Sequence, residues 1–197
     1  MKFTEPFCDF ACYVLLVQRS ICNGGCMAKE VNGYSGVQIA LHWIVVVLIA
    51  FQFLAHNAIE ASWRAFRNGE IPSESAAILT SLHVGVGMAV LLCMLCRVYL
   101  RLTRGAPSPP ADEPRLLKIV SEAVHRMIYV LLLLLPISGA VAWFFGASPA
   151  AGAHVIMEKL LLGLIAAHIG GALFQHLIRR SDVVVRMFAP ERPETVE

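Results

Sequence analysis

Residues 154–168 read HVIMEKLLLGLIAAH, and this stretch decides the fold. The stretch begins and ends with a histidine, and it belongs to an apolar run long enough to cross a bilayer. An imidazole inside a bilayer is costly unless something binds it, so intramembrane histidines are functional candidates. On a helix, His154 and His168 lie about 40° from alignment and about 21 Å apart along the axis. One helix face therefore offers two imidazoles at two membrane depths.

The composition around this stretch is that of a membrane protein. The chain has 197 residues, of which 57% are hydrophobic and 15% charged, and its mean hydropathy is +0.67. A transmembrane helix needs about 20 mostly apolar residues, and four windows satisfy this requirement: 37–55, 77–100, 123–145 and 155–178. The sequence therefore predicts an all-α integral membrane protein, a bundle of four transmembrane helices with no soluble domain between them.

The basic residues are distributed unevenly across this bundle. With an even number of spans both termini share one side, and that side carries 13 of the 16 Lys and Arg residues. The opposite side has only Arg64, Arg67 and Lys159. Because basic loops favour the cytoplasm, we expect both termini to be cytoplasmic. The net charge of +2 then reflects membrane topology, and no nucleic-acid partner is expected.

The first 33 residues do not fit the four-helix plan. We expect residues 1–33 to be an N-terminal extension outside the mature fold, residues 34–190 to be the functional domain, and residues 191–197 to be a cytoplasmic tail. Met27 is an alternative start of translation. Two C-x3-C pairs in the extension offer a second interpretation, a zinc or iron–sulfur site; their cysteines are Cys8, Cys12, Cys22 and Cys26.

Membrane depth decides which histidines can meet the two on the fourth helix. The second helix begins on the same side as the fourth, and His83 lies six or seven residues into it, so His83 should pair with His154. His42 lies near the start of the first helix on the other side, so it should pair with His168. Zinc wants its ligands around one point, whereas haem fills space between helices and is often held by His. We therefore expect two haems, an outer one at His83/His154 and an inner one at His42/His168.

Other polar residues near these depths have more than one interpretation. His125 opens the third window on the cytoplasmic side, where it could replace an inner ligand, bind a haem propionate, or help form a quinone site and deliver protons. Arg97 lies at the depth of the inner haem's carboxylates, which suit a guanidinium fork. The alternative for Arg97 is snorkelling to lipid phosphate, which we prefer for Arg101 and Arg104.

The remaining histidines and several glycines are less informative. His56 ends the first helix next to the outer loop and is either solvated or part of an outer substrate site. His176 lies about 80° away from the face of His168 and is expected at headgroup level. Five glycines near the paired histidines allow either close approach of a macrocycle or ordinary helix packing: Gly85, Gly87, Gly163, Gly170 and Gly171.

Taken together, several segments resemble the bacterial cytochrome b561 family. They are YSGVQIALHW at 34–43, LHVG at 82–85, HRMIY at 125–129, LPISG at 135–139 and RMFAP at 186–190, together with the spaced His154 and His168. The resemblance implies a four-helix protein of the bacterial inner membrane that holds two b-type haems and moves electrons between ubiquinone and a partner. It also implies four axial ligands: His42, His83, His154 and His168.

The resemblance leaves the electron donor open. Members of one branch of the family look like superoxide oxidases, which would make the chain a superoxide:ubiquinone oxidoreductase. Related four-helix cytochromes are membrane subunits of hydrogenases and formate dehydrogenases, so a redox protein partner is the alternative. A third possibility is a non-redox membrane protein with structural or metal-binding histidines. The predicted connection Gly146–Ala153 lacks the basic residues that would steer an anion, which weakens the superoxide assignment unless Arg64, Arg67 and Lys159 supply that field.

Overall fold

The computed structural model describes residues 33–108 and 113–190. The predictions for the N-terminal cysteines, for Met27 and for the tail at 191–197 lie outside the described residues. The described part is entirely helical, and four of its helices are long and apolar enough to cross a membrane. The elements are α2 (Gly36–Leu54), α3 (His56–Asn68), α4 (Glu74–Thr103), α5 (Arg115–Phe145), α6 (Ser148–Leu177) and the short 3-10 helix η1 (Val185–Met187). The predicted fold class is confirmed.

Local capping signals set where the first two long helices begin. At α2 the Ser35 hydroxyl accepts from the Gln38 backbone N–H (3.2 Å), while the Gln38 side chain accepts from the Ser35 N–H (3.0 Å). This reciprocal arrangement satisfies two backbone donors at the helix start. Ser73 caps α4 through the Ala76 N–H. Both helices therefore start where a side chain replaces the missing backbone acceptor.

The start of α5 was predicted too late. The helix begins at Arg115, so His125 lies well inside α5 and does not open it. The first two turns carry Lys118 and Glu122, which lower the local hydropathy but are good helix formers. A hydropathy window therefore reports the apolar part of this helix and misses its polar beginning.

The segment after the first span was expected to be a connection and is instead the helix α3. His56 begins this helix and does not end the preceding one. The helix is amphipathic and packs on α4, where the Thr80 hydroxyl donates to the Ser62 hydroxyl at 2.8 Å with both side chains buried. It stops at Gly69, whose φ of 72° lies in the left-handed region that favours glycine.

The predicted connection Gly146–Ala153 is also mostly helical. Gly146 ends α5 with a φ of 63°, and α6 begins at Ser148. Pro149 lies in the first turn of α6, where proline is tolerated because its missing N–H has no helical partner there. Most of the predicted connection is thus the first turn and a half of α6.

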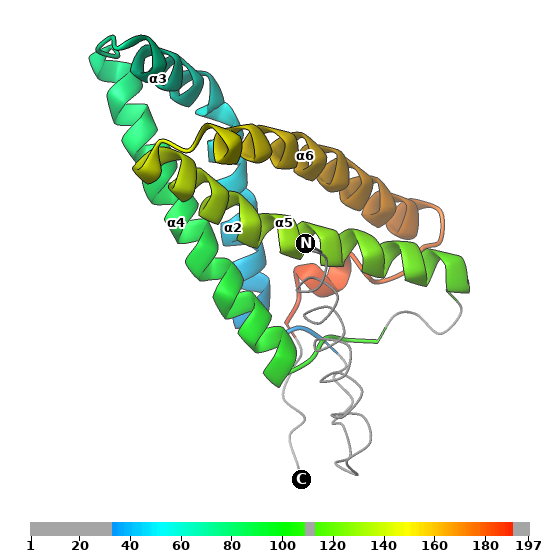
Figure 1. The fold of residues 1–197 in the computed structure, drawn as a ribbon. Helices are drawn as coiled ribbons and strands as arrows, with labels where there is room; N and C mark the ends of the chain where they lie inside the picture. The colour runs from blue at the N-terminus through cyan, green and yellow to red at the C-terminus, as the bar shows by residue number, and fades with distance from the viewer. Residues whose placement is uncertain (1–32, 109–112, 191–197) are drawn as a thin grey trace, which may run out of the picture. The chain divides into compact units, whose positions relative to one another are not determined.

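The four long helices form two hairpins, α2 with α4 and α5 with α6, which cross each other where α4 packs on α5 (Figure 1). An apolar cluster at the crossing draws on all four: Val45, Val90, Met94, Leu131, Leu132, Leu135 and Leu161. We call the end that carries α3 and the α5–α6 turn the α3 end, and the opposite end the η1 end. Many large apolar side chains point outward on every long helix, as expected for surfaces in contact with lipid.

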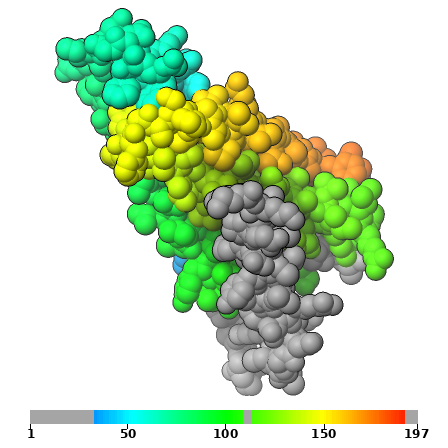
Figure 2. Space-filling model, in the orientation of Figure 1, coloured from blue at the N-terminus to red at the C-terminus, as the bar shows by residue number. Residues whose placement is uncertain are grey.

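The long helix α6 packs along α5 and, within the described residues, makes few close backbone approaches to α2 or α4. Figure 2 shows its outer surface as a continuous band across one face of the protein. Side chains that project from its opposite face therefore meet α2 and α4 across a gap. The two pairs of histidines lie in this gap.

Candidate functional site

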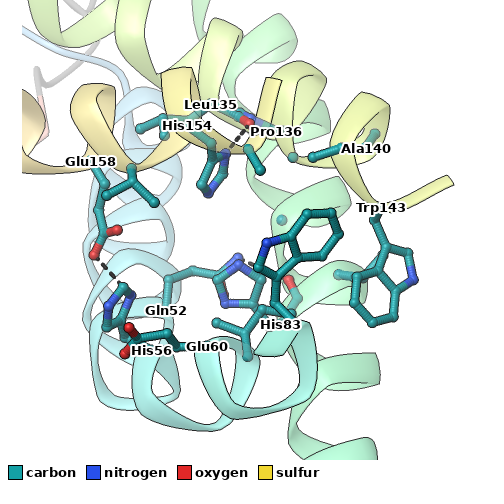
Figure 3. A pocket seen from close by; sticks show the side chains of 18 of the residues that line it. Gln52, His56, Glu60, His83, Leu135, Pro136, Ala140, Trp143, His154 and Glu158 are labelled. Atoms are coloured by element: carbon teal, nitrogen blue, oxygen red, sulfur yellow. Dashed lines mark hydrogen bonds and ion pairs between the residues drawn. The ribbon is translucent and has the colours of Figure 1, made fainter. Parts of the chain in front are cut away.

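At the α3 end, His83 on α4 and His154 on α6 face each other across a cavity of about 500 Å³. Figure 3 shows the two rings in this cavity, and their centroids are 6.4 Å apart. The cavity is also lined by α3, through Trp63 and Arg67 among others, and by Pro136 on α5. Its size lies within the range of about 300–1,000 Å³ that is usual for cofactor and ligand sites.

The orientation of His154 is fixed by α5. Its Nδ1–H donates to the Leu135 carbonyl oxygen at 2.9 Å, and the Ser138 hydroxyl lies 3.1 Å from the same nitrogen. A carbonyl only accepts, so Nδ1 carries the proton and Nε2 keeps its lone pair. Metal-bound histidines commonly donate their other ring N–H to a backbone carbonyl in this way.

Gly139 makes room for the His154 ring. A Cβ at this position would lie 3.0 Å from Cε1 and 3.2 Å from Nδ1 of His154. Sequence reasoning quoted Gly139 as part of a motif but missed this contact. In the sequence, Gly139 lies one helical turn after Leu135, whose carbonyl accepts from His154 in the structure.

The second pair lies towards the η1 end. His42 on α2 and His168 on α6 have ring centroids 6.4 Å apart, as in the first pair. Trp43 follows His42, and its indole N–H donates to the Met187 carbonyl at 2.9 Å while its ring lies 4.9 Å from that of Phe188. The segment that contains η1 therefore packs on α2 beside His42.

Both separations fit an iron held between two imidazoles. Metal–nitrogen bonds of about 2 Å, with each nitrogen about 1.1 Å from its ring centroid, place the two centroids about 6.2 Å apart. Within residues 33–108 and 113–190 no group of three or more His, Cys, Asp or Glu side chains is placed to hold a metal ion. Two imidazoles suffice for a haem with two axial ligands, whereas a structural zinc needs four ligands.

His125 also lies next to His168, but its geometry differs. The two centroids are 4.8 Å apart, which is too close for an iron between the rings. The His125 Nδ1–H donates to the Ser121 carbonyl at 2.7 Å, so its Nε2 keeps a lone pair. The distance disfavours His125 as the ligand opposite His168 and leaves the other interpretations standing.

Arg97 lies near the His42/His168 pair and donates to the Gln38 carbonyl and the Tyr129 hydroxyl, each at 3.2 Å. Both acceptors are neutral, so these contacts leave the guanidinium charge available to an anion. Arg97 and Arg101 also face the Tyr129 ring at 5.6 and 5.9 Å.

Together with Tyr34 these side chains line a cavity of about 20 Å³, room for one water. Burial raises the pKa of Tyr34 above its usual value, partly offset by Arg101.

The other histidines occupy distinct surroundings. His56 pairs with Glu158 of α6, with 3.1 Å between Nδ1 and Oε1, so it is held at the cavity and is not simply solvated. His176 is exposed in the last turn of α6. Sequence reasoning missed the Glu158 partner because it depends on how α3 meets α6.

Four of the five glycines singled out by sequence do not serve helix packing. No described neighbour lies within 4 Å of a Cβ added at Gly85, Gly163, Gly170 or Gly171. At Gly87 the side-chain nitrogen of Gln52 would lie 3.2 Å away, so this glycine admits a polar side chain. Gln52, which sequence reasoning did not consider, lines the cavity beside His83.

The sequence matches the family model described as prokaryotic cytochrome b561 over residues 33–190. The chain belongs to this family. It is 32% identical to cytochrome b562 of Cereibacter sphaeroides over 161 residues, which cover 80% of this chain and 96% of that protein. It is 27% identical to cytochrome b561 homolog 1 of Escherichia coli, with 79% and 97% covered, and 24% identical to a probable superoxide oxidase of Yersinia pestis, with 81% and 97% covered.

Membership of the prokaryotic cytochrome b561 family establishes the general role of the chain. It is a multi-pass bacterial membrane protein of electron transfer, and a cytochrome b family implies haem b as the cofactor. The resemblance stated from sequence motifs is therefore confirmed at the level of the family.

Proposed function

We propose that this chain holds two haems b and carries electrons across the inner membrane from a donor at the α3 end to ubiquinone. The observation that carries the proposal is the repetition of one geometry. Two imidazole pairs, one towards each end of the bundle, have the same centroid separation of 6.4 Å. Haem b at these pairs would supply the reversible one-electron chemistry of iron.

The protein's own residues have defined tasks in this proposal. His83 and His154 would ligate at the α3 end, and His42 and His168 would ligate towards the η1 end. The Leu135 carbonyl fixes the His154 tautomer, so that Nε2 would be the ligating atom. Arg97 would bind a haem carboxylate, because its two neutral contacts hold the guanidinium in place without neutralising its charge.

We favour superoxide over a redox protein as the donor. One relative is named a probable superoxide oxidase, and the α3 end offers cationic side chains to an anion. Arg67 lines the cavity, and Arg64 and Lys159 are exposed on α3 and α6. Charge asymmetry predicts that this end faces away from the cytoplasm. The same end also carries four carboxylates, with Glu60 and Glu158 in the cavity lining and Glu70 and Glu74 after α3, so the cations give no net positive field and the preference for superoxide rests on the named relative.

The haem assignment is tested by stoichiometry. The purified protein should show a b-type reduced-minus-oxidised spectrum and two haems per chain in a pyridine haemochrome assay. His154→Ala should lose one haem, because it empties one site and leaves the other pair intact. His176→Ala, an exposed histidine later on the same helix, should keep both and serves as the control. Loss of both haems or of neither in His154→Ala would contradict the pairing, and absence of haem would favour the non-redox alternative.

Electron transfer is tested with the isolated protein. Superoxide generated in solution should reduce a ubiquinone analogue at a rate that depends on the intact chain. An inactive preparation with both haems present would point instead to a membrane subunit that needs a dehydrogenase or hydrogenase partner. We propose His125 for the quinone site, and His125→Gln should keep both haems while slowing quinone reduction.

A further inference from the structure

The contact between Gln52 on α2 and His83 on α4 contains two buried polar atoms without a hydrogen-bond partner. They are the side-chain oxygen Oε1 of Gln52 and the ring nitrogen Nδ1 of His83. Leaving such a buried group unsatisfied is costly, so each calls for an explanation. Gln52 Oε1 can only accept a hydrogen bond, and His83 Nδ1 donates one whenever it carries a proton.

Gln52 is already held against the backbone of His83. Its Nε2 donates to the His83 carbonyl oxygen at 3.0 Å, which also fixes which end of the amide is the oxygen. Gly87 permits this approach, because a Cβ there would lie 3.2 Å from the Gln52 nitrogen. The two unpartnered atoms belong to neighbouring residues, Oε1 to the amide whose Nε2 contacts His83 and Nδ1 to the His83 ring, and no hydrogen bond joins them in this structure.

Comparison with His154 shows that His83 lacks an acceptor for its Nδ1–H. The Nδ1–H of His154 has the Leu135 carbonyl as its acceptor, whereas the Nδ1 of His83 has none within the described residues. If Nε2 of His83 binds iron, Nδ1 must carry the proton and requires an acceptor. Gln52 Oε1 is a buried acceptor without a partner on the residue that contacts His83.

We propose that Gln52 is a positioning residue for His83, and that its Oε1 accepts the Nδ1–H of His83 when that histidine ligates haem iron. This inference rests on the proposed function, because it requires His83 to be a ligand. An acceptor on the distal N–H makes the imidazole a stronger donor to iron and stabilises the oxidised state. Gln52 therefore lowers the reduction potential of one haem only.

The test is a redox titration of the two haems in the purified full chain. Gln52→Met, of similar length but without an acceptor, should raise the potential of one haem by roughly a tenfold change in its reduction equilibrium, about 59 mV for a one-electron couple. The other haem is the internal control and should not move. Gln52→Glu keeps an acceptor oxygen and should not raise either potential.

The outcomes separate this inference from the haem assignment. If Gln52→Met leaves both potentials unchanged or moves both equally, or if Gln52→Glu raises the same potential, Gln52 does not act through the His83 N–H. If Gln52→Met loses one haem while Gln52→Glu retains two, the acceptor role is supported, because both variants lose the Nε2 donor and Gln52→Glu alone keeps an acceptor oxygen. Loss of haem in both variants overturns it. Retention of two haems by His83→Ala would instead refute His83 as a ligand.

Discussion

At the scale of single residues, the pair at the α3 end depends on contacts that no spacing rule describes. His154 is held by a backbone carbonyl on one side and bordered by the bare Cα of Gly139 on the other. The ring therefore has little freedom to tilt. A change of one methyl group at position 139 acts directly on a ligand candidate.

Gly139→Ala should disturb the His83/His154 pair. The added Cβ would lie 3.0 Å from Cε1 of His154, so the ring or α5 must move. We expect loss of one haem or a changed spectrum of one haem, measured by pyridine haemochrome assay and low-temperature absorption. Gly163→Ala on α6 is the matched control, because a Cβ there meets nothing within 4 Å. Equal spectra for both variants and the wild type would show that the ring tolerates the intrusion.

The four paired histidines could be chosen from sequence because helix periodicity and membrane depth restrict their partners. His125 shows the limit of that reasoning, since depth alone placed it with the inner pair. Only the distance of 4.8 Å between its ring and that of His168 disfavours an iron between them. Gln52 and Glu158 were beyond prediction, because their contacts depend on the rotation of one helix against another.

At the scale of elements, α3 is the part that hydropathy could not anticipate. Its 13 residues are too polar and too short for a span, so a search for spans treats the segment as a connection. Its role comes from the face it turns to α4. Ser62 and Thr80 are 2% and 3% exposed, and they pair with each other in an otherwise apolar contact.

Thr80→Val should loosen α3 more than the loss of one hydroxyl suggests. It leaves the Ser62 hydroxyl buried without its partner, which costs roughly 1–3 kcal/mol of unfolding free energy. The combined variant Ser62→Ala/Thr80→Val should recover much of that loss, because no polar group is then stranded. Thermal unfolding in detergent and hydrogen exchange of α3 measure both effects. A double variant less stable than Thr80→Val alone would contradict the explanation.

At the scale of the whole molecule, orientation is the prediction that the fold by itself does not test. The basic residues predict that both termini and the η1 end are cytoplasmic. Alkaline phosphatase fused after Gly69, beyond α3, should be active, and the same reporter fused after Pro190 should be inactive. A fluorescent protein at these two positions should give the opposite pattern. Active phosphatase at Pro190 would reverse the orientation and move the proposed donor site to the cytoplasm.

The arrangement of the four spans was predictable only in part. Hydropathy located the long helices because each helix that crosses lipid must be apolar and must satisfy its own backbone hydrogen bonds. The crossing of the two hairpins follows from side-chain packing around Met94 and Leu161, the most deeply buried members of the core. The wide separation of α6 from α2 and α4 was not predicted, because it depends on how the two hairpins cross.

Because α6 supplies one histidine to each pair, the number of residues between His154 and His168 sets the separation of the two imidazoles along the helix. Inserting one residue there would turn one imidazole by about 100° and shift it by about 1.5 Å. Inserting seven residues would return both histidines to nearly the same helix face but increase their axial separation by about 10.5 Å. If two haems bind as proposed, this residue count sets the distance that an electron must tunnel between them, and a length change in this stretch would alter the position of one ligand relative to the other.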